Sequence, residues 1–273
     1  MARVITAADF TAAMCGQGPM PTSTRFIERL GTPRGVGLAL LPYLRDTIAY
    51  VDDDFIEDTI SSTRWNLAAD ATATTYAWAA ARSGTIQGST GTTDNGYHAI
   101  NGDVIWYGDA NCGMAVRMKW DVVTGFTFEI GFTDALTDET LPAVTDIDTP
   151  ATGNGATDVA VIHLDTDQTL TTAAFVGEST GSAFAAQKVD LGTFTPTAAT
   201  YYTFVVGLVG NTGMCAIWNT NDPANPKLEL STNTSLTSLL EGGTAVRPHI
   251  MSGTRNTTAK VTNIDRIAVW QDR

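Results

Sequence analysis

Short runs of alternating hydrophobic and polar residues dominate the chain from about residue 51 onward. In residues 126 to 132, Phe126, Phe128, Ile130 and Phe132 recur with period two, which places them on one face of a β-strand. Residues 114 to 120 alternate in the same way, and the short turn at 123–125 between the two runs predicts an antiparallel hairpin.

Similar runs predict further strands near residues 74–81, 97–107, 158–164, 171–176, 184–191, 201–209, 214–218, 227–230, 246–252 and 259–270. Many short strands joined by polar turns, with little helical periodicity, are typical of a sandwich. The predicted fold class is all-β, a two-sheet antiparallel jelly-roll sandwich over residues 51–273 with an extended N-terminal arm.

The predicted arm, residues 1–50, contains four of the ten prolines and no sustained alternation. Its apolar stretch at 36–41 is unusual for a free tail, because disordered segments are poor in aliphatic residues. Two interpretations stay open: a strap on the chain's own domain, or an arm that packs on a neighbouring subunit or a capsid. The predicted contact residues are Phe26, Val36, Leu38, Leu40, Leu41 and Tyr43.

Composition narrows the function classes. Charged residues make up only 16% of the chain and the net charge is −13, which argues against nucleic-acid binding because that affinity depends on Lys and Arg contacts to phosphates. There is no run of 18 apolar residues and no apolar run of signal-peptide length after Met1, so we expect no membrane partner and no export signal. The three widely spaced cysteines, Cys15, Cys112 and Cys215, are interpreted as buried small hydrophobic residues.

Three stretches together resemble one family: 52–55 (DDDF) with 64–65 (RW), the pair 115–120 and 128–134, and the last strand, 263–270. They are similar to the concanavalin A-like or laminin G-like jelly roll, in particular to the versions in virion proteins of tailed bacteriophages. The resemblance implies a lectin, a glycosidase or a phage capsid or tail component, and the site must decide among them.

Glu129 is the first candidate for chemistry, because it points away from the aromatic face of its strand. Sandwich-fold glycosidases use paired carboxylates on one strand face. The neighbours of Glu129 on its face are Gly131 and Thr133, so we expect a cross-strand charge pair with Arg117 and Lys119 instead of catalysis.

A second acidic motif, Asp52-x-Asp54-x-x-Glu57, imitates the E-x-D-x-x-E signature of sandwich-fold β-glucanases. Asp53 stands at an aliphatic position and Asp replaces the first Glu, a shortening that catalysis seldom tolerates. The motif is interpreted as a solvated acidic turn that leads into a buried Phe55, and no catalytic residue is predicted.

Acidic, histidine and aromatic residues are the candidates for metal and sugar sites. A calcium site is the alternative to a solvated loop for Asp146, Asp148, Asp158, Asp165 and Asp167, although their spacing matches no EF-hand. The spacing of His98, His163 and His249 matches no zinc motif, so neither a metal nor a cofactor is predicted. Six aromatic residues either fill the core, which is favoured, or stack on sugar rings: Tyr97, Trp106, Tyr107, Tyr201, Tyr202 and Trp218.

The sequence and its resemblance together predict a non-enzymatic structural virion protein, a capsid decoration or cement protein on the capsid exterior. The expected partners are the major capsid protein and further copies of the chain, with a trimer favoured. The alternative is a glycan-binding, lectin-like module of a tail fibre or receptor-binding appendage, and a glycosidase ranks third. The expected location is the virion surface, after synthesis in the host cytoplasm without a signal peptide.

Overall fold

The computed structural model describes residues 48–55, 60–70, 72–79, 84–135, 143–146, 151–152, 156–168, 173–178, 188–192, 194–209, 212–222, 224–235 and 245–272. The predicted contact residues of the arm, together with Cys15, Glu57 and Asp148, lie outside these ranges. No helix in the described ranges has the length and apolar character needed to cross a membrane.

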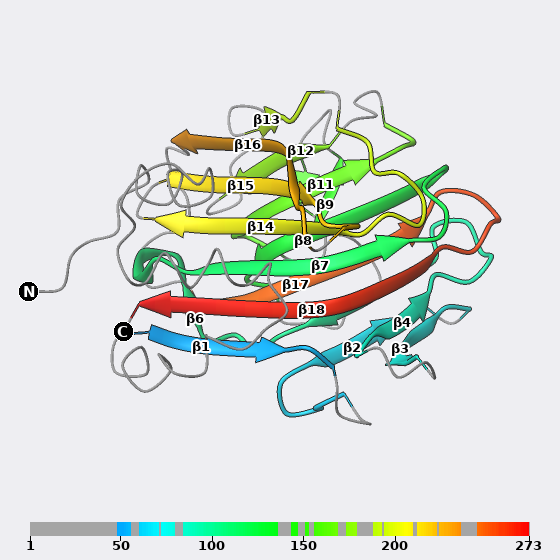
Figure 1. The fold of residues 1–273 in the computed structure, drawn as a ribbon, viewed down its shortest axis with the longest axis horizontal. Coiled ribbons are helices and arrows are strands. Elements are labelled where there is room, and N and C mark those ends of the chain that lie inside the picture. The colour runs from blue at the N-terminus through cyan, green and yellow to red at the C-terminus, as the bar shows by residue number, and fades with distance from the viewer. Residues whose placement is uncertain are drawn as a thin grey trace, which may run out of the picture.

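Two antiparallel sheets face each other, which confirms the predicted sandwich (Figure 1). The front sheet has the order β16-β15-β14-β7-β18-β4-β3, and β1 also pairs with β18. Its strands are β1 (Ile48–Asp53), β3 (Thr74–Trp78), β4 (Ile86–Ser89), β7 (Gly113–Trp120), β14 (Tyr202–Val209), β15 (Thr212–Asn219), β16 (Lys227–Ser235) and β18 (Val261–Asp272).

The back sheet has the order β13-β12-β11-β8-β17-β5-β2, and β6 also pairs with β17. Its strands are β2 (Asn66–Ala69), β5 (Tyr97–Asn101), β6 (Trp106–Tyr107), β8 (Phe126–Thr133), β11 (Val159–Asp165), β12 (Ala174–Glu178), β13 (Lys188–Asp190) and β17 (Ala245–Thr254). A short 3-10 helix, η1 (Gly108–Ala110), follows β6, and a separate two-stranded ladder joins β9 (Val144–Asp146) to β10 (Ala151–Thr152).

The core fills the space between the sheets. The alternating apolar residues of β7 and β8 point into it from opposite sides, and the ring of Trp120 lies 4.8 Å from the ring of Phe128. Phe126 and Phe204 also pack against Trp120, so an aromatic cluster forms the centre of the sandwich. Burial of these large apolar surfaces is the main favourable term in folding.

The predicted hairpin of residues 114–120 and 126–132 is wrong. β7 pairs with β14 and β18 in the front sheet, whereas β8 pairs with β11 and β17 in the back sheet. The connection at 121–125 therefore crosses from one sheet to the other. Alternation reports only which face of each strand is apolar, and two strands that face each other across a core have the same pattern as two neighbours in one sheet.

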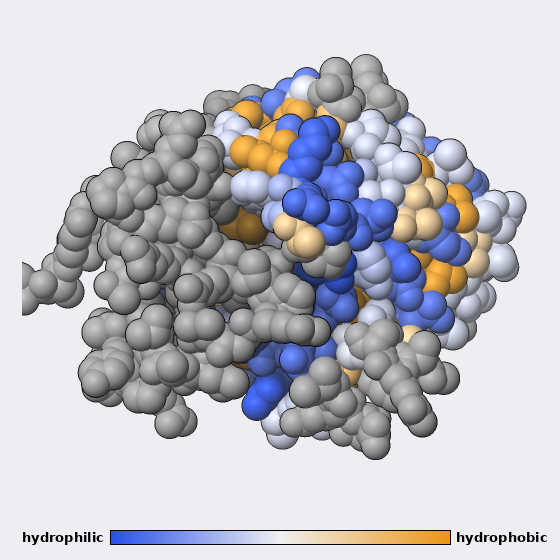
Figure 2. Space-filling view, in the orientation of Figure 1, coloured by the Kyte–Doolittle hydropathy of each residue, from blue (hydrophilic) through white to orange (hydrophobic). Residues whose placement is uncertain are grey.

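Two other predicted elements differ in detail. The strand expected at 97–107 is divided into β5 and β6, and a Cβ at Gly102 between them would come within 2.9 Å of the Pro248 ring. Strand β1 begins at Ile48, so the last three residues of the range assigned to the arm pair with β18. On the visible face of the front sheet, hydrophilic residues form a band between separate apolar groups (Figure 2).

Candidate functional site

A polar cluster lies on the outer face of the back sheet, where four neighbouring strands each contribute one side chain. Glu129 on β8 is opposite His163 on β11, and His249 on β17 is opposite Asn101 on β5. All four side chains are buried, with exposed fractions of 0–1%. The strands carry these residues at outward positions because their alternate positions, such as Phe128 and Ile130 on β8, fill the core.

Glu129 accepts four hydrogen bonds. Oε1 accepts the backbone N–H of Val144 at 2.7 Å and lies 3.1 Å from Nδ1 of His163. Oε2 accepts the backbone N–H of Ala143 at 2.8 Å and lies 3.0 Å from Nε2 of His249. A carboxylate has about four lone-pair positions, so these donors occupy its whole accepting capacity. The carboxylate thereby ties β9 and the residue before it to the outer face of the back sheet.

Burial alone raises the pKa of Glu129, because it disfavours the charged form. The hydrogen bonds from His163 and His249, together with their electrostatic attraction, outweigh burial and lower the pKa to about 2. Glu129 is therefore ionised at neutral pH. A general acid in a glycosidase needs the opposite shift, a raised pKa that keeps its proton.

His249 bridges Glu129 and Asn101. Its Nε2 faces the carboxylate, and its Nδ1 lies 2.7 Å from Oδ1 of Asn101, while Nδ2 of that amide has no partner among the described residues. A half-turn of the amide places Nδ2 against Nδ1 and gives it a hydrogen bond with a neutral imidazole.

A second carboxylate, Asp165, lies on the same outer face, diagonally across from Glu129: it is opposite Thr127 in the register of β8 and β11. It is 1% exposed and is held by Arg255, whose Nε lies 3.0 Å from both carboxylate oxygens and whose Nη2 also donates to Oδ2. Glycoside hydrolysis uses two carboxyl groups that flank the scissile bond. Here each is buried and already bound to its own donors, so neither is available to a substrate in this arrangement.

The Glu and His side chains are of types that bind divalent metals. All lone-pair positions of Glu129 are occupied by N–H donors, however, and within the described ranges no group of three His, Cys, Asp or Glu has the geometry of a metal site. Of the acidic residues considered for calcium, Asp165 is bound to Arg255, Asp158 is buried and Asp167 is exposed. For Asp146 the structure describes only the backbone, at the end of β9.

The predicted pairing of Glu129 with Arg117 and Lys119 is wrong, because those residues are on β7 in the other sheet. Arg117 forms an ion pair with Asp265 and lies 4.1 Å from the centre of the Tyr201 ring. The amine of Lys119 lies 4.5 Å from the same ring. His163, His249, Asn101 and Arg255 were missed as partners because they come from distant parts of the sequence.

The acidic motif near the start of the sandwich has structural partners. Asp52 forms an ion pair with Arg266, and Asp53 accepts hydrogen bonds from the backbone N–H of Phe55 and from Nε1 of Trp65. Phe55 is buried, as predicted. The interpretation as a fully solvated turn is therefore wrong for Asp52 and Asp53, which are anchored, and correct for Asp54, which is exposed.

The aromatic candidates separate into three groups. Tyr97, Trp106 and Tyr202 are buried, Tyr201 and Trp218 are half-buried, and Tyr107 is 38% exposed. Cys112 and Cys215 are buried, as the sequence predicted, and burial raises the pKa of Cys215 to about 12.

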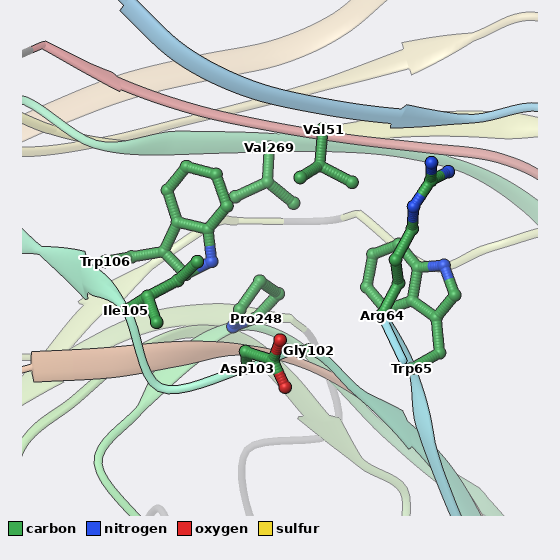
Figure 3. A pocket seen from close by; sticks show the side chains of 9 residues that line it. All are labelled: Val51, Arg64, Trp65, Gly102, Asp103, Ile105, Trp106, Pro248 and Val269. Carbon is green, nitrogen blue, oxygen red and sulfur yellow. The ribbon is translucent and has the colours of Figure 1, made fainter. Parts of the chain in front are cut away.

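A small pocket of about 40 Å³ opens at one edge of the sandwich, between β1 and β18 of the front sheet and β6 and β17 of the back sheet (Figure 3). Trp65 and Trp106 stand on opposite sides of it, and Ile105 beside it is 53% exposed. Its other lining residues are Val51, Arg64, Gly102, Asp103, Pro248 and Val269.

No protein-family model and no curated protein sequence matches this chain. Solved structures do match in fold. A protein of unknown function from Shewanella oneidensis has a TM-score of 0.55 and 13% identity, over 93% of this chain and 95% of that one. Peanut lectin, solved with a nine-residue peptide, has a TM-score of 0.53 and 12% identity, over 82% of this chain and 97% of that one.

Two further similar structures represent other functions. The CBM2 module of the evolved Dit protein of Lactobacillus casei phage J-1 has a TM-score of 0.51 and 12% identity, over 83% of this chain and 96% of that one. A glycosyl hydrolase family protein from Mycobacterium fortuitum also has a TM-score of 0.51, with 11% identity, over 81% of this chain and 98% of that one. At such identities the likeness shows the fold alone: the chain has the concanavalin A-like jelly roll that lectins and glycosyl hydrolase family proteins share.

Proposed function

We propose that this protein is a non-enzymatic structural protein of a bacteriophage virion, a decoration or cement protein on the capsid exterior. The proposal that the protein is not an enzyme rests on the two buried carboxylates on the outer face of the back sheet. Glu129 is buried with four donors on its oxygens, and Asp165 is buried against Arg255. A glycosidase needs one carboxyl group that holds a proton and a second that faces the sugar or a water, and this pair supplies neither.

The phage part rests on the sequence resemblance to virion jelly rolls and is supported by a similar fold in a phage Dit module. The net charge of −13 fits a module on the outside of a shell, away from the genome, and disfavours nucleic acid as a partner. The proposed partners are the major capsid protein and further copies of this chain, with a trimer favoured. Attachment is assigned to the arm, residues 1–50, through the contact residues named above.

Copy number tests the location. Quantitative mass spectrometry of purified virions measures this chain relative to the major capsid protein. Hundreds of copies per particle are expected for a decoration protein. A few copies per particle would move the protein to the tail and refute the capsid assignment.

Substitution in the full-length chain tests the arm. Leu40→Asp combined with Leu41→Asp should abolish co-sedimentation with shells depleted of the native protein, because a charge cannot be buried in an apolar interface without a partner. Ser23→Asp with Thr24→Asp adds the same charge at polar positions of the arm and should leave binding intact. Equal binding of both variants would refute attachment through residues 36–41.

Glycan binding by a tail-fibre or receptor-binding module is the second candidate function. The pocket between Trp65 and Trp106 favours it, because aromatic side chains and a few polar groups in a concave site are typical of ligand binding. A glycan array with the full-length chain tests this candidate. Saccharide-specific binding would make the decoration role an insufficient account of the protein, and an array without any signal would remove the second candidate.

A further inference from the structure

The indole N–H of Trp106 is a polar group within the mostly apolar wall of the pocket. The other indole, that of Trp65, donates to Oδ2 of Asp53 at 2.8 Å. Trp106 is 3% exposed, its Nε1 has no hydrogen-bond partner in the described part of the chain, and Figure 3 shows this nitrogen on the pocket side of the ring. The N–H opens into the pocket, so it is a donor available to an acceptor that enters there.

The volume limits what enters. A buried water needs roughly 10–15 Å³ and a benzene ring about 150 Å³, so the pocket of about 40 Å³ admits about three non-hydrogen atoms and no ring. Water pairs with the N–H of Trp106 but leaves the apolar surface of Val51, Val269 and Pro248 in contact with a polar molecule. An aliphatic side chain from a partner protein would fill the space but leave the N–H of Trp106 unpaired.

Two charged side chains at the pocket, Arg64 and Asp103, remain available. Both residues are exposed, and neither side chain forms an ion pair or a hydrogen bond in the described part of the chain. A guanidinium donates to hydroxyl oxygens and a carboxylate accepts from hydroxyl groups. The rim is therefore suited to a polyhydroxylated body that stays outside while a small group enters.

We propose that the pocket binds the acetamido group of an N-acetylhexosamine. The methyl group packs between Val51, Val269 and the indole rings, and the carbonyl oxygen accepts the N–H of Trp106. The sugar hydroxyls then reach Arg64 and Asp103 at the rim. This inference rests on the second candidate function, glycan binding, and is independent of where in the virion the protein resides.

The test is a titration of the ¹⁵N-labelled full-length chain followed by NMR, with N-acetylglucosamine and N-acetylgalactosamine as ligands. The chain has six tryptophans, and Trp106→Phe identifies the Trp106 indole resonance by its loss. We expect that resonance to shift saturably with both acetylated sugars and to stay unchanged with glucose or galactose at equal concentration. Trp106→Phe should weaken binding at least tenfold by calorimetry, whereas Tyr107→Phe, on the same short strand, should bind normally.

The other outcomes separate the inference from the function on which it rests. Equal shifts with glucose or galactose would retain glycan binding and overturn the acetamido assignment. A shift with Nε-acetyl-lysine but not with the acetylated sugars would keep the acetamido group and overturn the saccharide. If other resonances shift with a sugar and Trp106 does not, glycans bind elsewhere and the inference is wrong. If no ligand shifts any resonance, both the inference and glycan binding by this domain with these sugars fail.

Discussion

Replacement of Glu129 by Gln tests whether the outer-face cluster is structural. The substitution preserves the shape of the side chain and replaces one carboxylate oxygen by an NH₂ group. Each oxygen faces a backbone N–H, of Val144 at 2.7 Å or of Ala143 at 2.8 Å. A backbone N–H cannot become an acceptor, so whichever oxygen is replaced, two donors point at each other inside the protein.

The magnitude follows from these contacts. A hydrogen bond to a charged group contributes roughly 1.5–3 kcal/mol, and a buried donor left without a partner costs roughly 1–3 kcal/mol. Glu129→Gln loses at least one hydrogen bond to a charged group and leaves at least one buried donor without a partner. The site is buried, so water cannot replace the lost hydrogen bond. We expect a loss of about 3–5 kcal/mol in the free energy of unfolding, as for other broken buried charge networks.

The assay is urea denaturation at pH 7, followed by tryptophan fluorescence and far-UV circular dichroism. Glu229→Gln is the matched control, because Glu229 forms an ion pair with the exposed Lys227 at 3.4 Å, and it should change the free energy by at most about 1 kcal/mol. If Glu129→Gln is as stable as that control, Glu129 is not buried among donors and the reasoning fails.

Three further predictions concern acid, the core and metals. The pKa of Glu129 is about 2 in the folded protein, below its value of about 4.3 in an unfolded chain. The ionised carboxylate therefore stabilises the fold fully above about pH 4.3, and this contribution is lost as the pH falls towards 2. Glu129→Gln should lack this part of the acid dependence in thermal melts between pH 5 and 2. Phe128→Ala should lower the free energy of unfolding, measured by urea denaturation, by about 3–5 kcal/mol, because it leaves a cavity beside Trp120 and Phe204. Tyr107→Ala on the surface is the control. Similar losses for the two variants would contradict the assignment of the core. Addition of EDTA should leave the melting temperature unchanged, and a fall of ten degrees would show that a stabilising metal had been removed.

The faces of the strands could be predicted from the sequence, but not the pairing of the strands. Period-two alternation identified the inward residues of β7 and β8, all of which are buried in the core. The same alternation suggested that β7 and β8 are neighbours, whereas they belong to opposite sheets. The position of a short turn does not distinguish a hairpin from a connection between layers, because both leave the apolar faces adjacent in space.

For Glu129, alternation gave the direction of the side chain correctly and its environment wrongly. An outward position predicts exposure, but residues 143–144 lie against that face and pack beside the outward valines of β11. The signal that could have shown this lies in β11, where Val159–Asp165 is apolar at both inward and outward positions up to Leu164, apart from His163. A strand that is apolar on both faces is buried on both faces. A polar residue within such a strand needs a buried partner, and the partner of His163 is the carboxylate of Glu129. The alternation of β8 by itself predicts that this carboxylate faces solvent.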